Sequence, residues 1–294
     1  MRPYQVISDS SCDIAPEYIE KTGLGIVPFF VSFDGQKYYK EVYELSPDDF
    51  YDKINETSIF PKTSQPTIQD YMDVFEPNLK EGKDILCLCL TSNFSGSFQS
   101  AVNAKNILNE SYPESRIEVL DSRNVTGSQC LLVWEILRMR DEGYNLDQQL
   151  EKIEAIKGTT KINFTVDSLE HLQKGGRIGK AAALAGTILN IKPIIIAQHG
   201  ELFPENKVRG HKKALRTIMD MTRNEIGNQK DQYRLILLYA EKERKEIAVE
   251  LSEELKQEGF DVITPAITQV GITIGTHAGP TAIGICYVKK HEYA

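Results

Sequence analysis

A strand, a loop and a helix follow one another in Ile85-Leu-Cys-Leu-Cys-Leu90-Thr-Ser-Asn-Phe-Ser-Gly-Ser97-Phe-Gln99. Six consecutive apolar residues are typical of a strand that is buried on both faces. The polar loop Thr91–Ser97 then leads into a helical pattern over Gln99–Leu108. Because a buried strand followed by a helix is half of a βαβ unit, this stretch predicts a parallel α/β sheet.

The same order of elements recurs on both sides of this stretch. Tyr4–Ser8 and Ile117–Leu120 have strand patterns, and Leu131–Arg140 has a helical pattern. Strands separated by helices in this way form an open, mainly parallel sheet with right-handed crossovers. We therefore expect the first of two α/β domains to span residues 1–160.

A hairpin is expected between the strand patterns Tyr4–Ser8 and Ile85–Leu90. Asp34-Gly35 separates the strand patterns Ile26–Phe33 and Gln36–Glu41 and is a favoured two-residue hairpin turn. The segment Lys62-Thr63-Ser64-Gln65-Pro66-Thr67 is polar and is predicted to be a loop, whose last residue caps the next helix.

The second half mixes helices and strands with short connections, which predicts a mixed α/β layer. This second domain is expected to span residues 161–294. Its expected strands are Ile162–Val166, Pro193–Ala197, Arg234–Tyr239, Val262–Ile267 and Ala282–Val288. Its expected helices are one that ends at Gly175-Gly176, then Lys180–Leu189, Val208–Asn224 and Glu243–Gln257.

Charge and hydropathy exclude several classes of protein. The formal net charge of −8 speaks against nucleic acid as a partner, because neutralising phosphates needs a basic face. The longest mainly apolar stretch, Ala181–Ile191, is interrupted by polar residues and glycine and falls short of the roughly 20 residues of a spanning helix. Met1–Ser8 runs straight into a strand pattern without a leader. We therefore expect a cytoplasmic protein without an integral membrane segment.

The five cysteines do not indicate a metal site. Cys87 and Cys89 flank Leu88 within a strand pattern, so both are expected to lie on one strand face as small hydrophobic residues. A zinc site would need a second cluster of Cys or His ligands at suitable spacing, and the sequence has none.

The loop Thr91–Ser97 is the strongest candidate for a binding site. It follows the carboxyl end of a buried strand, where open parallel sheets bind their ligands. The helix after the loop offers free N–H groups and the positive end of its dipole, so hydroxyl groups and a glycine here suit a carboxylate or a phosphate. The alternative, that these residues only form a turn and a helix cap, is about equally consistent with the loop alone.

Two further segments, both expected to be polar loops, suit the same ligand. Lys62–Thr67 carries three hydroxyl groups, and Gly275-Thr276-His277-Ala278-Gly279-Pro280 places a histidine among small residues before the last strand. Histidine titrates near neutral pH, and it donates to an anion or accepts a proton. A single histidine is more often a structural hydrogen-bonding residue, and that interpretation stays open here.

Standard catalytic motifs are absent from the sequence. It has neither a G-x-S-x-G elbow nor a G-x-x-x-x-G-K-[ST] loop, and Gly175-Gly-Arg-Ile-Gly179 does not fit G-x-G-x-x-G. No nucleotide cofactor is therefore expected.

Several short motifs together resemble the DegV family of bacterial fatty-acid-binding proteins over essentially the whole chain. Each motif is short, but their order and spacing make the joint match specific. The motifs are Ser8-Asp-Ser-Ser-Cys-Asp13, Val27-Pro28, Lys62-Thr-Ser-Gln-Pro66, Ser95-Gly-Ser97 with Gln99-Ser-Ala101, Lys174-Gly-Gly-Arg-Ile178, Ile191-Lys-Pro-Ile194 and Thr276-His-Ala-Gly-Pro280.

The resemblance implies two α/β domains with a long-chain fatty acid bound between them. In such proteins a threonine, a serine and a histidine bind the carboxylate, and here these are Thr63, Ser95 and His277. Ser64, Gly96 and Ser97 lie in the same loops and are predicted to add to the ligand site. The resemblance also implies a partner, a separate ATP-dependent fatty acid kinase that makes an acyl phosphate for phospholipid synthesis. The chain itself would perform no chemistry.

Two arginines match the family pattern, and two other positions depart from it. Arg177 and Arg209 match basic family positions and are assigned to the head-group entrance or to the kinase contact. The family usually reads H-x-G-P-G, and here Thr281 stands in the last place. After Asp121-Ser122 it often reads S-x-G-x-G, whereas this chain has Thr126-Gly-Ser-Gln-Cys130. The larger side chains are expected to affect the acyl-chain preference rather than the fold.

Two other functions stay open on the sequence alone. In the first, His277 activates Ser95 as a nucleophile for acyl transfer or hydrolysis. The sequence offers no identifiable acid to orient His277, which argues against this enzyme. In the second, the same loops bind another small anion, such as a phosphate ester, in a pocket too polar or too short for an acyl tail.

Overall fold

The protein is described by a computed structural model that covers residues 2–184 and 190–294. The first sheet has four strands in the order β2-β1-β6-β7, and every pair in it is parallel. Its strands are β1 (Tyr4–Asp9), β2 (Gly25–Val27), β6 (Asp84–Cys89) and β7 (Ile117–Asp121). The predicted parallel sheet is confirmed.

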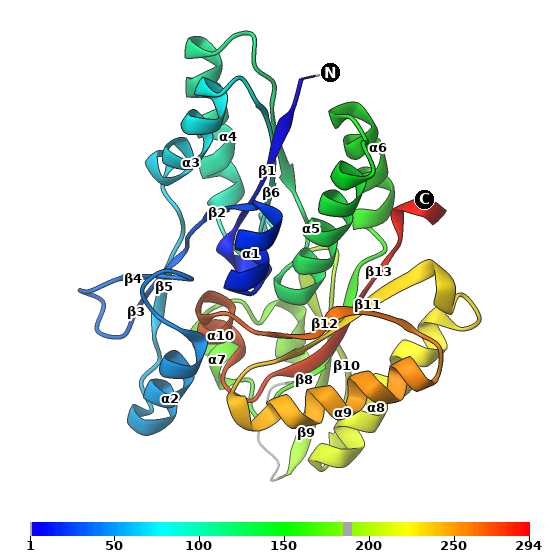
Figure 1. Ribbon diagram of the computed structural model, residues 1–294. Helices are drawn as coiled ribbons and strands as arrows, with labels where there is room; N and C mark the ends of the chain where they lie inside the picture. Colours follow the sequence, from blue (N-terminus) through cyan, green and yellow to red (C-terminus); the bar gives the residue numbers. More distant parts are fainter. Residues whose placement is uncertain (1, 185–189) are drawn as a thin grey trace.

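Helices cover both faces of this sheet (Figure 1). They are α1 (Pro16–Thr22), α3 (Ile68–Lys80), α4 (Ser97–Ser111), α5 (Thr126–Asp141) and α6 (Leu146–Lys157). Cys87 and Cys89 point to the face that packs on α3 and α4, as expected of small hydrophobic residues on one strand face. Leu86 and Leu88 point the other way, toward α5.

A small antiparallel sheet extends from the first domain in the order β4-β3-β5. It consists of β3 (Phe30–Ser32), β4 (Tyr39–Lys40) and β5 (Lys62–Ser64), with helix α2 (Pro47–Thr57) between the last two. We call residues 30–64 the arm. The prediction that Lys62–Thr67 is a loop was wrong at its start, because Lys62–Ser64 pairs with β3.

The predicted hairpin exists, but its turn is longer than two residues. The carboxylate of Asp34 accepts hydrogen bonds from the N–H groups of Gln36 and Lys37, which holds a wider turn between β3 and β4. The expected strand Ile26–Phe33 is interrupted between β2 and β3, where Pro28 has no N–H group for a ladder.

The second sheet has six strands in the order β10-β9-β8-β13-β11-β12. Only β11 and β12 are parallel neighbours, so the predicted mixed layer is confirmed. The strands are β8 (Lys161–Thr165), β9 (Ile191–Gln198), β10 (Glu201–Arg209), β11 (Tyr233–Tyr239), β12 (Asp261–Gln269) and β13 (Ile283–Lys289). Helices α8 (His211–Ile226) and α9 (Lys245–Gln257) pack on one face. A short helix α7 (Glu170–Lys174) follows β8.

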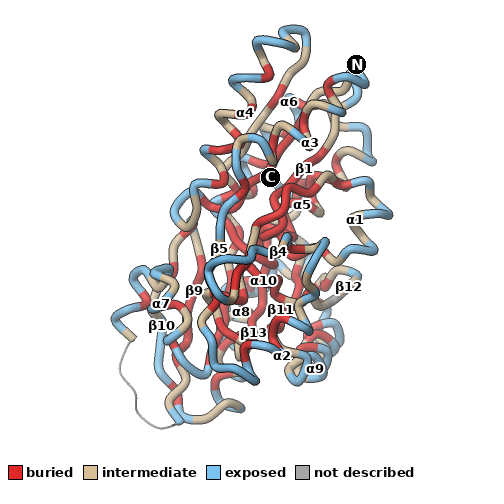
Figure 2. The backbone as a smooth tube through the Cα atoms, turned by 90° about the vertical axis from the view of Figure 1, so that its left-hand side faces the viewer, coloured by how far each residue is buried: buried red, intermediate tan, exposed pale blue. Residues whose placement is uncertain are grey.

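Helix α5 lies between the two sheets and joins their cores. Most of its side chains are buried, and they pack with Leu86 and Leu88 on one side and with Ile236 and Cys286 on the other. Figure 2 shows that buried segments run through the centre of the molecule from β1 and α5 to β11 and β13. The two domains therefore share one hydrophobic core around this helix.

Three expectations for the second domain need correction. The helix expected at Val208–Asn224 starts only at His211, because Val208 and Arg209 belong to β10, which was not predicted. Residues 275–280 are not a loop throughout, since α10 spans Ile272–Ala278. Of the helix expected at Lys180–Leu189, the first part is a 3-10 helix over Gly179–Leu184, and residues 185–189 lie outside the described residues.

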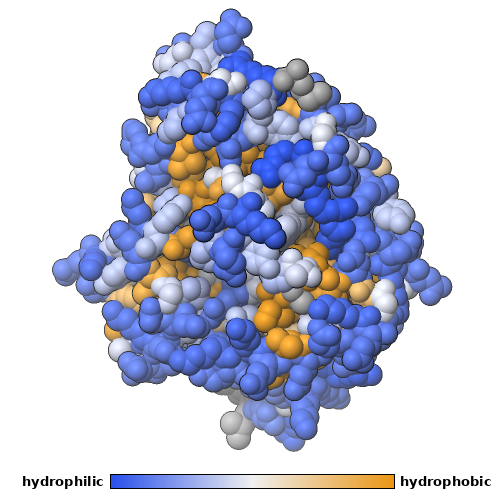
Figure 3. Space-filling model, in the orientation of Figure 1, coloured by the Kyte–Doolittle hydropathy of each residue, from blue (hydrophilic) through white to orange (hydrophobic). Residues whose placement is uncertain are grey.

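The face seen in Figure 1 is mainly hydrophilic. Figure 3 shows apolar side chains gathered in separate patches on the face seen in Figure 1, one of them over β12. Within residues 2–184 and 190–294, no helix combines the length and the apolar character that crossing a bilayer requires.

Candidate ligand-binding site

A cavity of about 330 Å³ lies between the two sheets. Both domains contribute to its apolar wall: Leu90 and Val125 come from the first, and Phe164, Leu202 and Leu238 come from the second. The volume falls within the usual range for small-molecule sites, although near its lower end. Because Leu90 follows β6, the cavity opens at the carboxyl ends of the first sheet, as the strand order predicts.

Polar side chains gather at one side of this cavity. They come from all three segments that the sequence singled out: Thr63, Ser64 and Gln65 at the end of the arm, Ser95 after β6, and His277 in the last turn of α10. Arg177 joins them from the turn after α7. Ser64, Gln65 and Arg177 are exposed, so this polar side is the mouth of the cavity.

Thr63 and His277 are in direct contact. The hydroxyl oxygen of Thr63 lies 3.0 Å from Nε2 of His277. In the part of the chain that the structure describes, Nδ1 of His277 is buried and has no hydrogen-bond partner. Burial, followed by the positive charges of Arg177 and of protonated His171, lowers the pKa of His277 to about 4. The imidazole is therefore neutral at pH 7 and keeps one N–H group for a ligand or a neighbour.

A glycine allows His277 to take this position. A Cβ at Gly175 would lie 2.1 Å from Nδ1 of His277, closer than non-bonded Cβ contacts in proteins. The sequence pattern predicts a helix end at Gly175-Gly176. The missing side chain of Gly175 also makes room for His277.

The loop that carries Ser95 is tied to the arm by Gln65. The N–H group of Gly96 donates to Oε1 of Gln65 over 2.8 Å, and Nε2 of Gln65 donates to the Ser100 hydroxyl over 3.4 Å. A Cβ at Gly96 would lie within 2.8 Å of this amide, so glycine permits the close approach. Ser95 is half-buried, and its hydroxyl accepts a hydrogen bond from the N–H group of Ser97. Gln65 belongs to the motif Lys62–Pro66, but the motif alone predicts no role for its side chain.

Ser97 lies beside the cavity rather than on its lining. Its buried hydroxyl donates to Oδ2 of Asp9 over 3.0 Å and lies 2.6 Å from the hydroxyl of Tyr71. The same carboxylate accepts from the N–H group of Leu90 and from the side chain of Gln129. Burial raises the pKa of Asp9, and these hydrogen bonds oppose that shift. Ser97 and Asp9 thus fix both ends of the loop that carries Ser95.

The two predicted arginines lie in different parts of the structure. Arg177 lines the cavity, and its guanidinium donates to the carbonyl oxygens of Phe94 and Gly175 over 3.2 and 2.7 Å. It therefore links the two domains at the mouth. Arg209 is the exposed last residue of β10 and does not line the cavity.

The residues of both departures from the family pattern can be located in the structure. Thr126 lines the cavity at the start of α5 with a positive φ of 46°, and Gln129 is buried against Asp9. The hydroxyl of Thr281 accepts a hydrogen bond from the N–H group of Asp167. Thr126 is thus part of the cavity wall, and Thr281 contacts the segment between β8 and α7.

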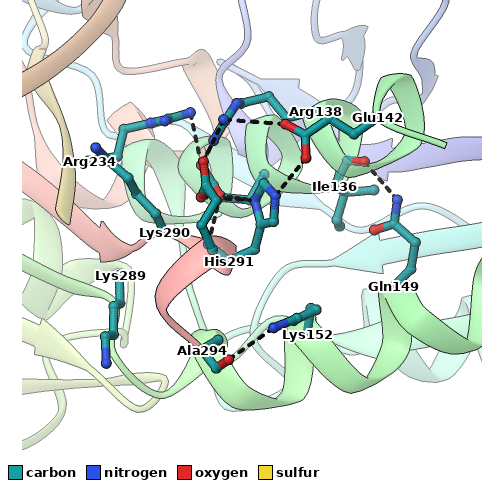
Figure 4. A network of polar contacts seen from close by, with 12 residues as sticks. Ile136, Arg138, Glu142, Gln149, Lys152, Arg234, Lys289, Lys290, His291 and Ala294 are labelled. Carbon is teal, nitrogen blue, oxygen red and sulfur yellow. Dashed lines mark hydrogen bonds and ion pairs between the residues drawn. The ribbon is translucent and has the colours of Figure 1, made fainter. Parts of the chain in front are cut away.

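One cluster of possible metal ligands occurs in the described part of the chain, formed by Glu135, His291 and Glu292. Nδ1 of His291 contacts Glu135 over 2.6 Å, and Arg138 and Arg234 pair with the two glutamates over 2.7 and 3.0 Å. Figure 4 shows these contacts where the C-terminal residues reach α5. Because cations already neutralise its carboxylates, the cluster is an ion-pair network that fastens the C-terminal residues.

A mainly apolar cavity with a polar mouth lies between two α/β domains. This is the architecture of a ligand-binding protein. The sequence profile described as an uncharacterised protein of the DegV family matches residues 3–290. The chain belongs to the DegV family, as its motifs predicted.

Relatives cover the whole length of the chain. A DegV domain-containing protein of Caldanaerobacter subterraneus subsp. tengcongensis is 36% identical over an alignment of 297 residues, and the match covers 99% of this chain and 100% of that protein. A stearic acid-binding protein from Eubacterium ventriosum has a similar structure, with a TM-score of 0.94, 34% identity, and coverage of 99% of this chain and 100% of that one. A DegV family protein from Thermus thermophilus, described for its fatty acid binding, has a TM-score of 0.88, 29% identity, and coverage of 98% and 100%.

Proposed function

We propose that this protein binds a long-chain fatty acid, with the acyl tail between the domains and the carboxylate at the polar mouth. The observation that carries the proposal is the position of Thr63, Ser95 and His277 at the polar mouth of a mainly apolar cavity. The relative from Eubacterium ventriosum, which is 34% identical and has the same fold, is described as binding stearic acid.

Burial of the tail supplies the main driving force. About 14 methylene groups at roughly 0.8 kcal/mol each correspond to a gross gain on the order of 11 kcal/mol. Association and ordering oppose a large part of this gain. The remainder still favours an acyl ligand over a short polar anion, because the walls offer few polar partners.

The carboxylate needs hydrogen-bond donors, since a bare buried charge is strongly unfavourable. The hydroxyl group of Ser95 fills this role, with Ser64 beside it at the mouth. The hydroxyl group of Thr63 and Nε2 of neutral His277 share one hydrogen bond, so at most one of these two groups donates to the carboxylate while that bond lasts, and both donate once it opens. The N–H group of Gly96 is engaged by Gln65, so it joins the ligand only if that side chain moves. Arg177 adds a positive charge at the mouth.

We further propose that the chain holds the lipid for a separate ATP-dependent fatty acid kinase in the cytoplasm and performs no chemistry itself. Nε2 of His277 contacts Thr63, and within the described residues no acid bonds its Nδ1. A histidine that activates a serine needs both a bond to that serine and an orienting partner. This geometry supports a binding role over the Ser95 nucleophile.

The domain boundary belongs to the same proposal. We place it between residues 160 and 161, so that the tail lies between two units. The support is that the strands of the first sheet end by Asp121 and that β8 begins at Lys161.

A displacement titration with a fluorescent fatty acid tests the binding proposal. We expect stearic acid to displace the probe at micromolar or lower concentration. Octadecanol, which has the same tail without a carboxylate, is expected to be at least about tenfold weaker, because hydrogen bonds to a charged group contribute about 1.5–3 kcal/mol. Failure of every fatty acid from 12 to 20 carbons to displace or bind would contradict the proposal.

A further inference from the structure

Helix α10 carries His277 into the mouth, but its own start lacks a capping side chain. The residue before the helix is Gly271, which has no side chain to accept a bond from the first free N–H groups. The acceptor comes from the other domain instead. Oε1 of Glu41, on the arm, accepts a hydrogen bond from the N–H group of Thr273 over 2.9 Å.

We infer that Glu41 is a positioning residue for the ligand site, because it fixes the start of the helix whose last turn carries His277. The inference rests on the proposed function, since His277 is there a ligand-binding residue. Thr273 and His277 are four residues apart, so they share one face of the helix, about one turn from each other. A displacement of the N–H group of Thr273 is thus passed to the imidazole.

The surroundings of Glu41 suit this role. The side chain is buried, and Oε2 accepts the hydroxyl hydrogen of Ser10. Among the described residues no cation forms an ion pair with Glu41, so the start of the helix is its main source of positive charge. Its orientation is therefore set by two donors, one from each domain.

Asp13, also from the first domain, lies beside Glu41 at Gly271. A Cβ at residue 271 would be 2.4 Å from Oδ1 of Asp13 and 2.5 Å from Oε1 of Glu41. Glycine is thus required for the two carboxyl groups to reach the helix start. Burial and then the charge of Glu41 raise the pKa of Asp13 well above its usual value, and burial also raises the pKa of Glu41.

The arm contacts α10 at two further points. The hydroxyl of Tyr51 donates to the carbonyl oxygen of Val270 over 2.8 Å, and its ring packs against Gly275. Thr63 contacts His277 at the end of the helix. Glu41, Tyr51 and Thr63 therefore hold the start, the middle and the end of α10, and all three lie on the arm. The arm sets both the position of His277 and that of its hydrogen-bonding partner.

Two variants of Glu41 test the inference. In Glu41→Ala the cap is lost, and we expect stearic acid to dissociate about fivefold faster, which is the size of effect that loss of a helix cap produces. In Glu41→Gln an amide oxygen remains to accept from Thr273, and we expect dissociation within about twofold of the wild-type rate. Asn145→Ala removes the cap of α6, away from the mouth, and serves as the matched control with an unchanged dissociation rate.

A second readout separates positioning from general stability and from the proposed function. The ring signals of ¹³C-labelled His277, followed by NMR without any lipid, are expected to shift in Glu41→Ala and to return toward wild type in Glu41→Gln. Tyr51→Phe, which loses only the bond to Val270, is expected to shift the same signals and covers the case that Glu41→Ala does not fold. Unchanged His277 signals in folded Glu41→Ala, or in Tyr51→Phe if the alanine variant does not fold, would overturn the inference. A wild-type protein that binds no fatty acid would instead overturn the proposed function and leave this NMR test intact.

Discussion

The hydroxyl of Thr63 lies 3.0 Å from Nε2 of His277, although 214 residues separate them along the chain. Thr63 lies near the end of the arm of the first domain, and His277 lies in the last turn of a helix of the second. The mouth of the cavity therefore exists only where the two domains meet. A ligand bound there contacts both domains at its head group and both along its tail.

Removing a single hydroxyl group from the mouth is expected to weaken binding without unfolding the protein. Thr63→Val and Ser95→Ala each remove one donor to the carboxylate, and we expect a loss of affinity of about tenfold, or about 1.5 kcal/mol. Displacement titrations measure this change. Ser92→Ala lies in the same loop with its hydroxyl on Asp121, and its affinity should match wild type. Equal affinities for all four proteins would exclude the carboxylate site described above.

Gly175→Ala is expected to move His277 without touching the ligand directly. The new Cβ would lie 2.1 Å from Nδ1 of His277, so the ring or the backbone must shift. We expect at least about tenfold weaker binding, because a misplaced imidazole no longer donates to the carboxylate. Gly158→Ala, where a Cβ meets nothing within 4 Å, is the matched control. Affinity of Gly175→Ala equal to that of the control would show that His277 does not bind the head group.

Stability without lipid is expected to fall as the pH drops from 6.5 toward 4. The pKa of His277 is lowered to about 4 in the folded protein, chiefly by burial, and is near 6.5 in the unfolded chain. Between these values only the unfolded chain takes up the proton, so the stabilisation is complete above pH 6.5 and decreases below it. We expect His277→Gln to lose about 1–2 kcal/mol less than wild type between pH 7 and pH 5. Denaturant titrations at both pH values check this, and parallel losses in the two proteins would refute it.

Ser97→Ala is expected to affect stability more than binding. The change removes a donor to the buried carboxylate of Asp9 and a partner of Tyr71, which should lower the free energy of unfolding by about 1–2 kcal/mol. Because the hydroxyl does not line the cavity, we expect the affinity for stearic acid to change by less than about threefold. If Ser97→Ala instead keeps its full stability but loses much of its affinity, the Ser97 hydroxyl contributes to the ligand site.

The buried strands could be predicted because their sequences are almost continuously apolar. β6 and β11 were placed within one or two residues, and the loop after β6 lies at the cavity as expected. β10 escaped prediction because Glu201–Arg209 contains Pro204 and several charges, which suit an edge strand with an irregular register. The small residues before Pro280 suggested a loop, although packing against Tyr51 stabilises a helix there.

The three binding segments were found because hydroxyl, glycine and histidine residues stand out in short polar runs. The residues that hold them in place were not found, since their partners are distant in sequence. Asp9 supports the loop of Ser95 across 81 and 88 residues, and Glu41 supports α10 across 232 residues. A single sequence contains no local pattern that pairs such residues. Only the fold brings them together.

Native mass spectrometry of the purified protein, followed by organic extraction and lipid analysis, tests the central claim most directly. We predict one fatty acid of about 14 to 18 carbons for each chain, released on denaturation and depleted in the double variant Thr63→Val, Ser95→Ala. A protein that carries no lipid and takes up none when stearic acid is added would contradict the account.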